Sequence, residues 1–184
     1  MSSSKSILRQ LADIVLKSLT TRTSRTPNQE PGRSAASGPY SEPGRAQASE
    51  TVRIDPGGIR ELRVDYSPKK DGAPDSGEVI WTWVPYEEND GRGKDRPVLV
   101  IGRQSADRVF AVRMTSKAHD RDRDYLPIGS GGWDSQGRPS WVDIEQLYSV
   151  HVDGMRREAA VLDRTRYDRV ADALVSRYGW ATRS

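Results

Sequence analysis

The sequence contains no cysteine, only two histidines and only one phenylalanine in 184 residues. The absence of cysteine excludes disulfides, thiolate nucleophiles and zinc sites of the cysteine type. His119 and His151 alone are too few for a multi-histidine metal site, so we expect neither a metal nor a cofactor. No stretch approaches the roughly 18 apolar residues that a transmembrane helix requires. A chain without cysteine also fits a reducing cytoplasm, which is the location we expect.

Positive charge is in excess, with a net charge of +3 and a pI near 9.3. Residues 1–50 hold seven Lys or Arg and four Asp or Glu, which accounts for the whole excess. Any nucleic-acid contact by the rest of the chain must therefore come from the local placement of Arg and Lys, and not from bulk charge.

Apolar residues are unevenly distributed along the chain, and their distribution predicts four parts. Residues 1–19 are predicted to form an amphipathic helix, because apolar residues recur there at helical spacing. Residues 20–50 are almost without apolar side chains and are predicted to be a disordered linker. Residues 51–76 are predicted to be a leading strand or short hairpin followed by a second linker, and residues 77–184 to be the folded domain.

The predicted N-terminal helix has a basic polar face with Lys5, Arg9 and Lys17. We favour packing of this helix on its own domain or on a partner over contact with a membrane surface, which a basic face also permits. Arg9 and Lys17 interrupt the apolar positions, so we do not expect a signal peptide here.

The folded domain begins with strand patterns and ends with a helix pattern. Asp163 can cap the helix and Gly179 can end it. Short strands followed by one helix indicate a mainly β fold, a small barrel with a helical cover, and not a doubly wound sheet. The expected strands cover residues 77–85, 96–102, 109–116, 125–128 and 140–152, the last with a bend near Gln146.

Four motifs in this domain resemble those of the MazF/PemK family of toxin ribonucleases. Gly77-Glu78-Val79-Ile80-Trp81 resembles the opening strand of the family, and Arg96-Pro97-Val98-Leu99-Val100 after Lys94-Asp95 resembles its most diagnostic stretch. Thr115-Ser116 stands where the family has a Thr-Ser pair, and Glu145-Gln146-Leu147 resembles the end of its late strand. The resemblance covers roughly residues 77–178.

This resemblance implies an SH3-like barrel of the MazF/PemK/CcdB type that forms a homodimer. It also implies an endoribonuclease that cuts single-stranded RNA without a metal, through attack of the ribose 2′-oxygen on the neighbouring phosphorus. The products would be a 2′,3′-cyclic phosphate and a 5′-hydroxyl. An antitoxin protein would neutralise the toxin, and the complex of the two would bind DNA.

The resemblance implies catalytic roles for particular residues. Arg96 takes the role of the catalytic arginine, because a guanidinium matches two phosphate oxygens at once. Thr115 would donate a hydroxyl to the scissile phosphate, with Ser116 beside it as a substrate contact. The proton acceptor is open between Glu145, which matches the acid of the late strand, and His119, which titrates in a suitable range.

Further residues are candidates for binding RNA. Lys94, Lys117 and Arg121 are candidate contacts to the RNA backbone, as is Arg123, and Trp133 and Tyr125 could stack on bases. For each of these charges, a solvated loop is the plain structural alternative.

Two observations favour hypotheses other than a toxin nuclease. Asp143 stands where some family members have a basic residue, which removes a candidate proton donor. A catalytically degenerate barrel that binds RNA or protein as a regulatory module is therefore the main alternative. The N-terminal extension suggests a third hypothesis, in which the N-terminal helix docks a partner.

Overall fold

The structure is a computed structural model that describes residues 49–69, 71–88 and 90–182. The helix expected over residues 1–19 lies outside these residues, as does nearly all of the linker expected over residues 20–50.

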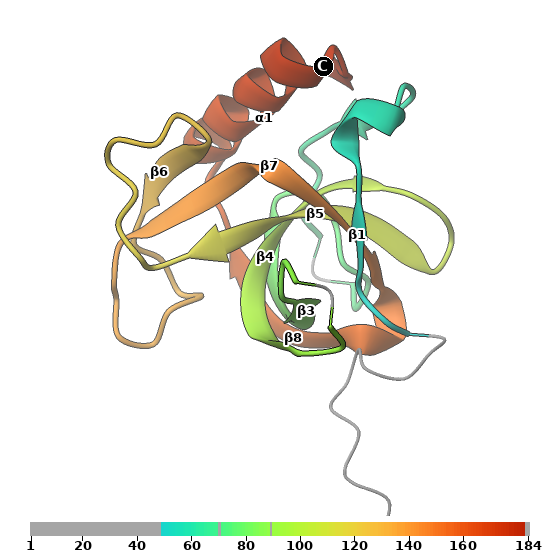
Figure 1. Ribbon diagram of the computed structural model, residues 1–184, viewed down its shortest axis with the longest axis horizontal. Coiled ribbons are helices and arrows are strands. Elements are labelled where there is room, and N and C mark those ends of the chain that lie inside the picture. The colour runs from blue at the N-terminus through green and yellow to red at the C-terminus, as the bar shows by residue number, and fades with distance from the viewer. Residues whose placement is uncertain (1–48, 70, 89, 183–184) are drawn as a thin grey trace, which may run out of the picture. The chain divides into compact units, whose positions relative to one another are not determined.

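An antiparallel sheet of seven strands makes up most of the described fold, and the helix α1 follows it (Figure 1). The strands lie in the order β1-β7-β5-β4-β3-β8, and β6 also pairs with β7. Two further strands, β2 and β9, form a separate parallel pair. The bounds are β1 Val52–Ile54, η1 Pro56–Gly58, β2 Arg63–Val64, β3 Glu78–Pro85, β4 Gly93–Arg103, β5 Arg108–Thr115, β6 Tyr125–Gly129, β7 Ser140–His151, η2 Val152–Gly154, β8 Met155–Val161, α1 Arg164–Tyr178 and β9 Ala181–Thr182, where η marks a 3-10 helix.

The sheet curls until its first strand meets β3. Thr51, directly before β1, lies 3.0 Å from Thr82 of β3 between their hydroxyl oxygens, and both residues are buried. The predicted fold, a small mainly β barrel with a C-terminal helix, is confirmed. The predicted strands of the barrel are also found, and β7 has its irregularity between Val142 and Leu147, where the bend was expected.

Alternating side chains of the strands build two hydrophobic cores on opposite faces of the sheet. Leu99 and Ile101 of β4 belong to the larger core, which also contains the apolar stripe of α1. Val98 and Val100 face the other way, into a smaller core with Tyr148 of β7. Because β4 is buried on both faces, it holds the ends of its neighbours in fixed positions.

The expected caps hold α1 in place. The Asp163 carboxylate accepts a hydrogen bond from the Arg166 backbone N–H at 3.0 Å, and Gly179 ends the helix with a φ of 71°.

Residues 51–66 pack on the barrel that was expected to begin at residue 77. Leu62 and Val64 are buried in the larger core. Gly77 has a φ of +99°, and an added Cβ would lie 2.6 Å from the Tyr66 ring, so a larger residue would separate the two segments. The alternation in residues 51–66 arises from strands that pair with β7 and β9, and not from a hairpin.

The strand β8 was not predicted from the sequence. Its sequence contains three consecutive charged residues, Arg156, Arg157 and Glu158, so it has no apolar alternation. The segment is recognised as a strand only from its pairing with β3.

No helix among the described residues is long and apolar enough to cross a membrane.

Candidate functional site

Arg96 and Thr115 lie across from one another on neighbouring strands. The antiparallel register of β4 and β5 pairs Val98 with Arg113. Two residues further along each strand, the same register brings Arg96 opposite Thr115. Side chains alternate along a strand, so Arg96, Thr115 and Arg113 project from one face of the sheet. The structure thus brings together the two residues to which the sequence assigned the phosphate contacts.

These two residues line a pocket of about 530 Å³ at the end of β4 and β5. Six of the eleven residues proposed from the sequence share this pocket, and its acidic members, Asp95 and Asp134, are both paired with arginines. The six proposed residues in the lining are Lys94, Arg96, Thr115, Ser116, Lys117 and Trp133.

The Arg96 side chain makes no hydrogen bond or ion pair with any described residue. Its Nε atom is buried and has no partner within the described part of the chain. Burial and the nearby charge of Arg113 lower the pKa of the Arg96 guanidinium. A half-buried cation without an anion is an unfavourable arrangement that a bound phosphate would relieve.

Thr115 has a hydroxyl that is already oriented. Its Oγ1 atom accepts a hydrogen bond from the Lys117 backbone N–H at 3.1 Å. The hydroxyl proton is therefore free to be donated to a ligand oxygen. Ser116 and Lys117 are exposed beside it.

Arg113 is a second cation of this face that the sequence reasoning did not propose. Its Nη2 atom lies 2.6 Å from Asp143 Oδ2, with side-chain exposures of only 11% and 1%. The same Nη2 atom donates to the Tyr125 hydroxyl at 3.0 Å. A charged residue inside the apolar run of β5 was the feature of the sequence that could have identified it.

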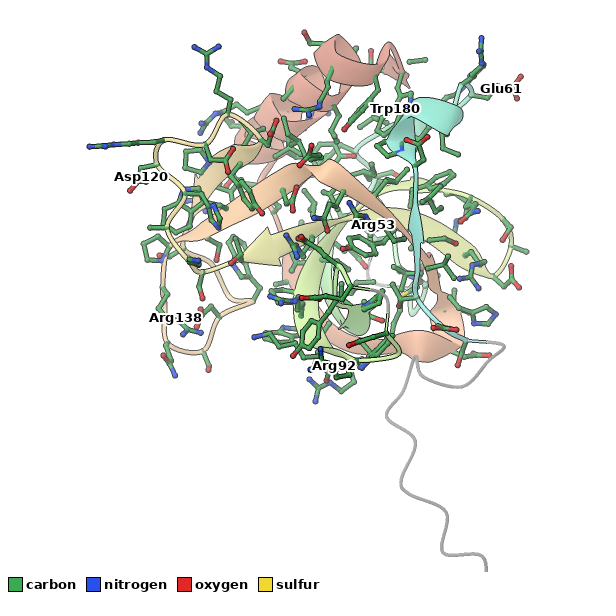
Figure 2. All side chains as sticks on the ribbon, viewed as in Figure 1. Arg53, Glu61, Arg92, Asp120, Arg138 and Trp180 are labelled. Carbon is green, nitrogen blue, oxygen red and sulfur yellow. The ribbon has the colours of Figure 1, made fainter. Side chains whose placement is uncertain are left out.

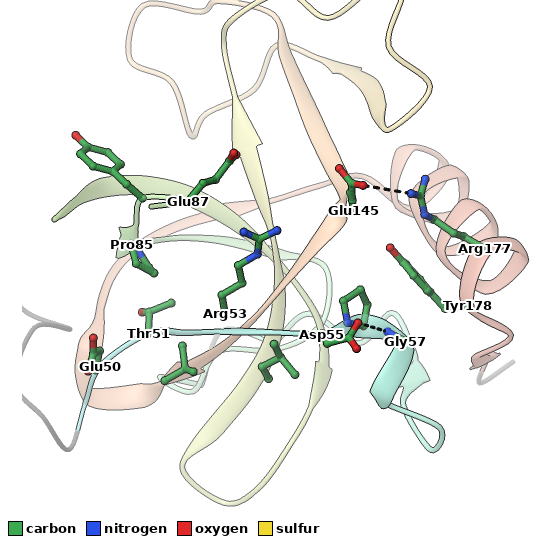
Figure 3. Close-up of a pocket in the computed structure, with 14 residues that line it drawn as sticks. Glu50, Thr51, Arg53, Asp55, Gly57, Pro85, Glu87, Glu145, Arg177 and Tyr178 are labelled. Carbon is green, nitrogen blue, oxygen red and sulfur yellow. Dashed lines mark hydrogen bonds and ion pairs between the residues drawn. The ribbon is translucent and has the colours of Figure 1, made fainter. Parts of the chain in front are cut away.

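Glu145 and His119, the two proposed proton acceptors, lie outside the pocket lined by Arg96 and Thr115. Glu145 projects into a second pocket, where Oε1 is 3.9 Å from Arg177 Nη2 (Figure 3). The His119 ring stacks on Tyr125, with 3.6 Å between the centroids and 8° between the planes. Through Tyr125, His119 is connected to Arg113 and not directly to Arg96.

The charged loop between β5 and β6 is solvent-exposed, and Figure 2 shows Asp120 at its outer side. Arg121 and Arg123 form no ion pair among the described residues, and the neighbouring Asp124 pairs with Arg177 of α1. Two unpaired arginines therefore project near the end of β5, where a polyanion could reach them.

Trp133 does not present its ring to solvent, and this corrects its proposed stacking on bases. Its side chain is only 3% exposed and belongs to the larger core. Its Nε1 atom donates to the Ser140 hydroxyl at 3.0 Å, so the indole is fixed as part of the pocket wall. Trp83 and Trp141 are buried as well.

No group of three or more His, Asp or Glu in the described residues has the arrangement of a metal site.

Comparison with known proteins identifies the family of the segment that contains this pocket. Residues 75–176 match the model of the PemK-like, MazF-like toxin of type II toxin-antitoxin systems. The chain belongs to this family. Its matched segment includes β3 to β7 and nearly all of α1, and thus every residue proposed for the site. The toxins of this family are endoribonucleases.

Two solved structures match the chain at low sequence identity. A chain of the MazE-MazF crystal structure (Form-II) from Deinococcus radiodurans has 19% identity and a TM-score of 0.44, over 58% of this chain and 96% of that chain. The Mycobacterium tuberculosis toxin MazF-mt6 has 17% identity and a TM-score of 0.40, over 55% of this chain and 97% of that chain. No curated protein matches the chain by sequence.

Proposed function

We propose that this chain is a toxin endoribonuclease that cleaves single-stranded RNA through attack of the ribose 2′-oxygen. The observation that carries the proposal is the unpaired, half-buried guanidinium of Arg96 opposite Thr115, within the segment that matches the toxin family. The two side chains would bind the non-bridging oxygens of the scissile phosphate.

The reaction forms one bond to phosphorus and breaks another. The 2′-oxygen bonds to phosphorus while its proton passes to a base, and the P–O5′ bond breaks while the 5′-oxygen gains a proton. The products are a 2′,3′-cyclic phosphate and a 5′-hydroxyl. Because the nucleophile is part of the substrate, the step requires neither an external water nor a metal.

Arg96 and Thr115 would act on the charge that develops at phosphorus. A phosphorane carries more negative charge than the ground-state diester, so a fixed guanidinium stabilises it more strongly than the substrate. Because no described residue pairs with it, the fork of Arg96 is available for two oxygens. The Thr115 hydroxyl, oriented by the Lys117 N–H, would donate to a third oxygen.

Lys94, Lys117, Arg121 and Arg123 would bind the flanking phosphates. Family membership further supports a homodimer, neutralisation by an antitoxin protein and DNA binding by that complex. We propose the cytoplasm as the site of action.

A catalytically degenerate module is the second candidate function, and a specific observation favours it. Neither Glu145 nor His119 lines the pocket that contains Arg96, and Asp143 is bound to Arg113. Such a module would bind RNA or protein through the same basic face without cutting.

The deciding experiment is incubation of the purified full-length chain with RNA in EDTA, followed by analysis of the new ends. We expect 2′,3′-cyclic phosphate and 5′-hydroxyl ends at the same rate with and without the chelator. RNA that stays intact but bound would support the degenerate module, and chelator-sensitive cutting would contradict the proposed chemistry.

Growth of a host cell provides a second readout. Expression of the wild type should arrest growth and Arg96→Ala should relieve the arrest. Arg169→Ala is the matched control, because it removes an exposed arginine on α1, remote in sequence from the pocket.

A further inference from the structure

A second pocket, of about 870 Å³, lies beside the proposed catalytic face (Figure 3). One wall is residues 50–57, which precede the segment that matches the family model. The opposite walls are residues 85–87 at the end of β3, Glu145 of β7, and residues 177–178 at the end of α1. The pocket is therefore built partly by an extension that the family match does not include.

The structure of β7 explains why a pocket opens here. The strand β6 pairs with β7 over Ser140–Asp143, and β1 pairs with it over Leu147–Ser149. The irregular stretch between these pairings contains Glu145, which no strand covers. The strands β6 and β1 thus border this uncovered stretch of β7, one at each end.

The wall formed by β1 is firmly held. Arg53 pairs in register with Tyr148 of β7, and Thr51 is buried against Thr82. Arg108 donates to the Glu50 carbonyl oxygen at 2.7 Å. A wall fixed at both its start and its centre can present a side chain in a defined position.

Arg53 projects into this pocket, between Glu87 and Glu145 (Figure 3). Its side chain is exposed and has no hydrogen bond or ion pair with the described residues, although carboxylates stand on two sides of it. The hydrogen bond from Gln146, followed by the nearby charges of Arg113 and Arg53, lowers the pKa of Glu87 despite some desolvation. Both an arginine fork and an ionised carboxylate thus face the same space.

Glu87 connects this pocket to the proposed phosphate site. Its Oε1 atom accepts a hydrogen bond from Gln146 Nε2 at 2.9 Å and lies 3.6 Å from Arg113 Nη2. Arg113 stands two residues before Thr115 on β5. Glu87 and Arg113 thus connect this pocket to the strand that carries Thr115.

We propose that the pocket binds a guanine base next to the scissile phosphate, and that Arg53 determines this specificity. The inference rests on the proposed function. Guanine presents two adjacent acceptors, N7 and O6, that match an arginine fork, while its N1–H and N2–H groups can donate to a carboxylate such as Glu87. Adenine has an amino group beside N7, and uracil has an N–H between its two carbonyl oxygens. Cytosine also has two adjacent acceptors, N3 and O2, but it offers a carboxylate only one amino group in place of the adjacent N1–H and N2–H of guanine.

The test is the cleavage motif of the full-length chain on a randomised RNA, read from its 5′-hydroxyl ends. We expect the wild type to prefer guanine at one position beside the cut. Arg53→Ala should reduce that preference about tenfold or more. Arg53→Lys, which keeps the charge but loses the fork, should lose most of the preference as well.

Arg60→Ala is the matched control, because it removes an exposed arginine of the same extension that does not line the pocket. Its motif should equal that of the wild type. Identical motifs for the wild type and Arg53→Ala would overturn the inference while leaving the nuclease intact.

Binding of 2′-O-methyl oligonucleotides, which lack the nucleophile, separates this inference from the proposed function. We expect tighter binding when guanine replaces adenine at one position, and loss of the difference in Arg53→Ala. A chain that does not cut RNA but shows this difference would refute the nuclease and retain the guanine site. Equal affinity for both oligonucleotides would refute the guanine site.

Discussion

Arg113 and Asp143 form an ion pair of 2.6 Å on adjacent strands, and both side chains are nearly inaccessible to solvent. Removing one partner of a buried pair leaves the other charge without compensation, which typically costs about 3–5 kcal/mol. We therefore expect Asp143→Ala to lower the free energy of unfolding by about that amount, measured by urea denaturation.

The double variant Arg113→Met with Asp143→Leu is the control for this pair. Replacement of both partners by apolar residues leaves no buried charge, so stability should return to within about 1–2 kcal/mol of the wild type. A double variant as unstable as Asp143→Ala would show that the loss came from packing and not from charge.

Arg96→Ala should separate activity from stability. Arg96 makes no described hydrogen bond or ion pair, so its removal should leave the urea midpoint unchanged or slightly raised. The cleavage rate should fall about 10²–10³-fold, which is typical for the loss of one group that stabilises transition-state charge. Unchanged cleavage in a well-folded Arg96→Ala protein would remove the basis of the proposed mechanism.

The proton acceptor can be identified from the pH dependence of kcat/KM. We expect Glu145→Gln to reduce the rate by about 10²-fold and His119→Gln to have a much smaller effect. The Glu145 carboxylate is exposed in the adjoining pocket, whereas the His119 ring is stacked on Tyr125. An acid limb in the wild-type profile that disappears in His119→Gln would instead identify histidine as the base.

The sequence was sufficient to predict the strands and helix of the barrel, because their apolar periodicity and caps are local features. It also suggested Arg96 and Thr115, which line the same pocket near the start of β4 and the end of β5. It did not reveal that Arg113 binds Asp143 or that Glu145 lies in a different pocket from Arg96. Those relations depend on the β5–β7 register and on the irregularity in β7, which no local pattern encodes.

Residues 51–66 illustrate the same limit in the fold. Their short alternating segments predicted strands, but the partners of those strands are β7 and β9, far along the chain. The pocket beside Arg53 exists only because β1 pairs with β7, so the sequence of residues 50–57 alone does not predict it.

Stability should decrease at acidic pH in part through Glu87. Its pKa is lowered in the folded protein from the ordinary value of 4.5. This carboxylate therefore contributes stability above pH 4.5, and the contribution is lost as the pH falls through the lower folded pKa. Because the side chain is 59% exposed, the effect should be below about 1 kcal/mol.

The measurement for Glu87 is the urea midpoint between pH 3 and pH 7, at roughly one-unit steps, for the wild type and Glu87→Gln. The two curves should differ near neutral pH and converge at the acid end. A constant difference across the whole range would mean that the charge of Glu87 has no part in it.

The hydroxyl of Tyr167 links residues 51–66 to the barrel. Tyr167 is 1% exposed, and its hydroxyl donates to the carbonyl oxygens of Asp65 and Ile101. Tyr167→Phe keeps the ring but leaves buried carbonyl groups without this donor, so the free energy of unfolding should fall by about 1–3 kcal/mol.

Tyr86→Phe is the control, because the Tyr86 hydroxyl makes no described hydrogen bond and its loss should change stability by less than about 0.5 kcal/mol. If residues 51–66 unfolded independently, Tyr167→Phe would expose them to proteases without shifting the urea midpoint of the barrel. A single cooperative transition at lower urea would instead show that residues 51–66 and the barrel unfold together.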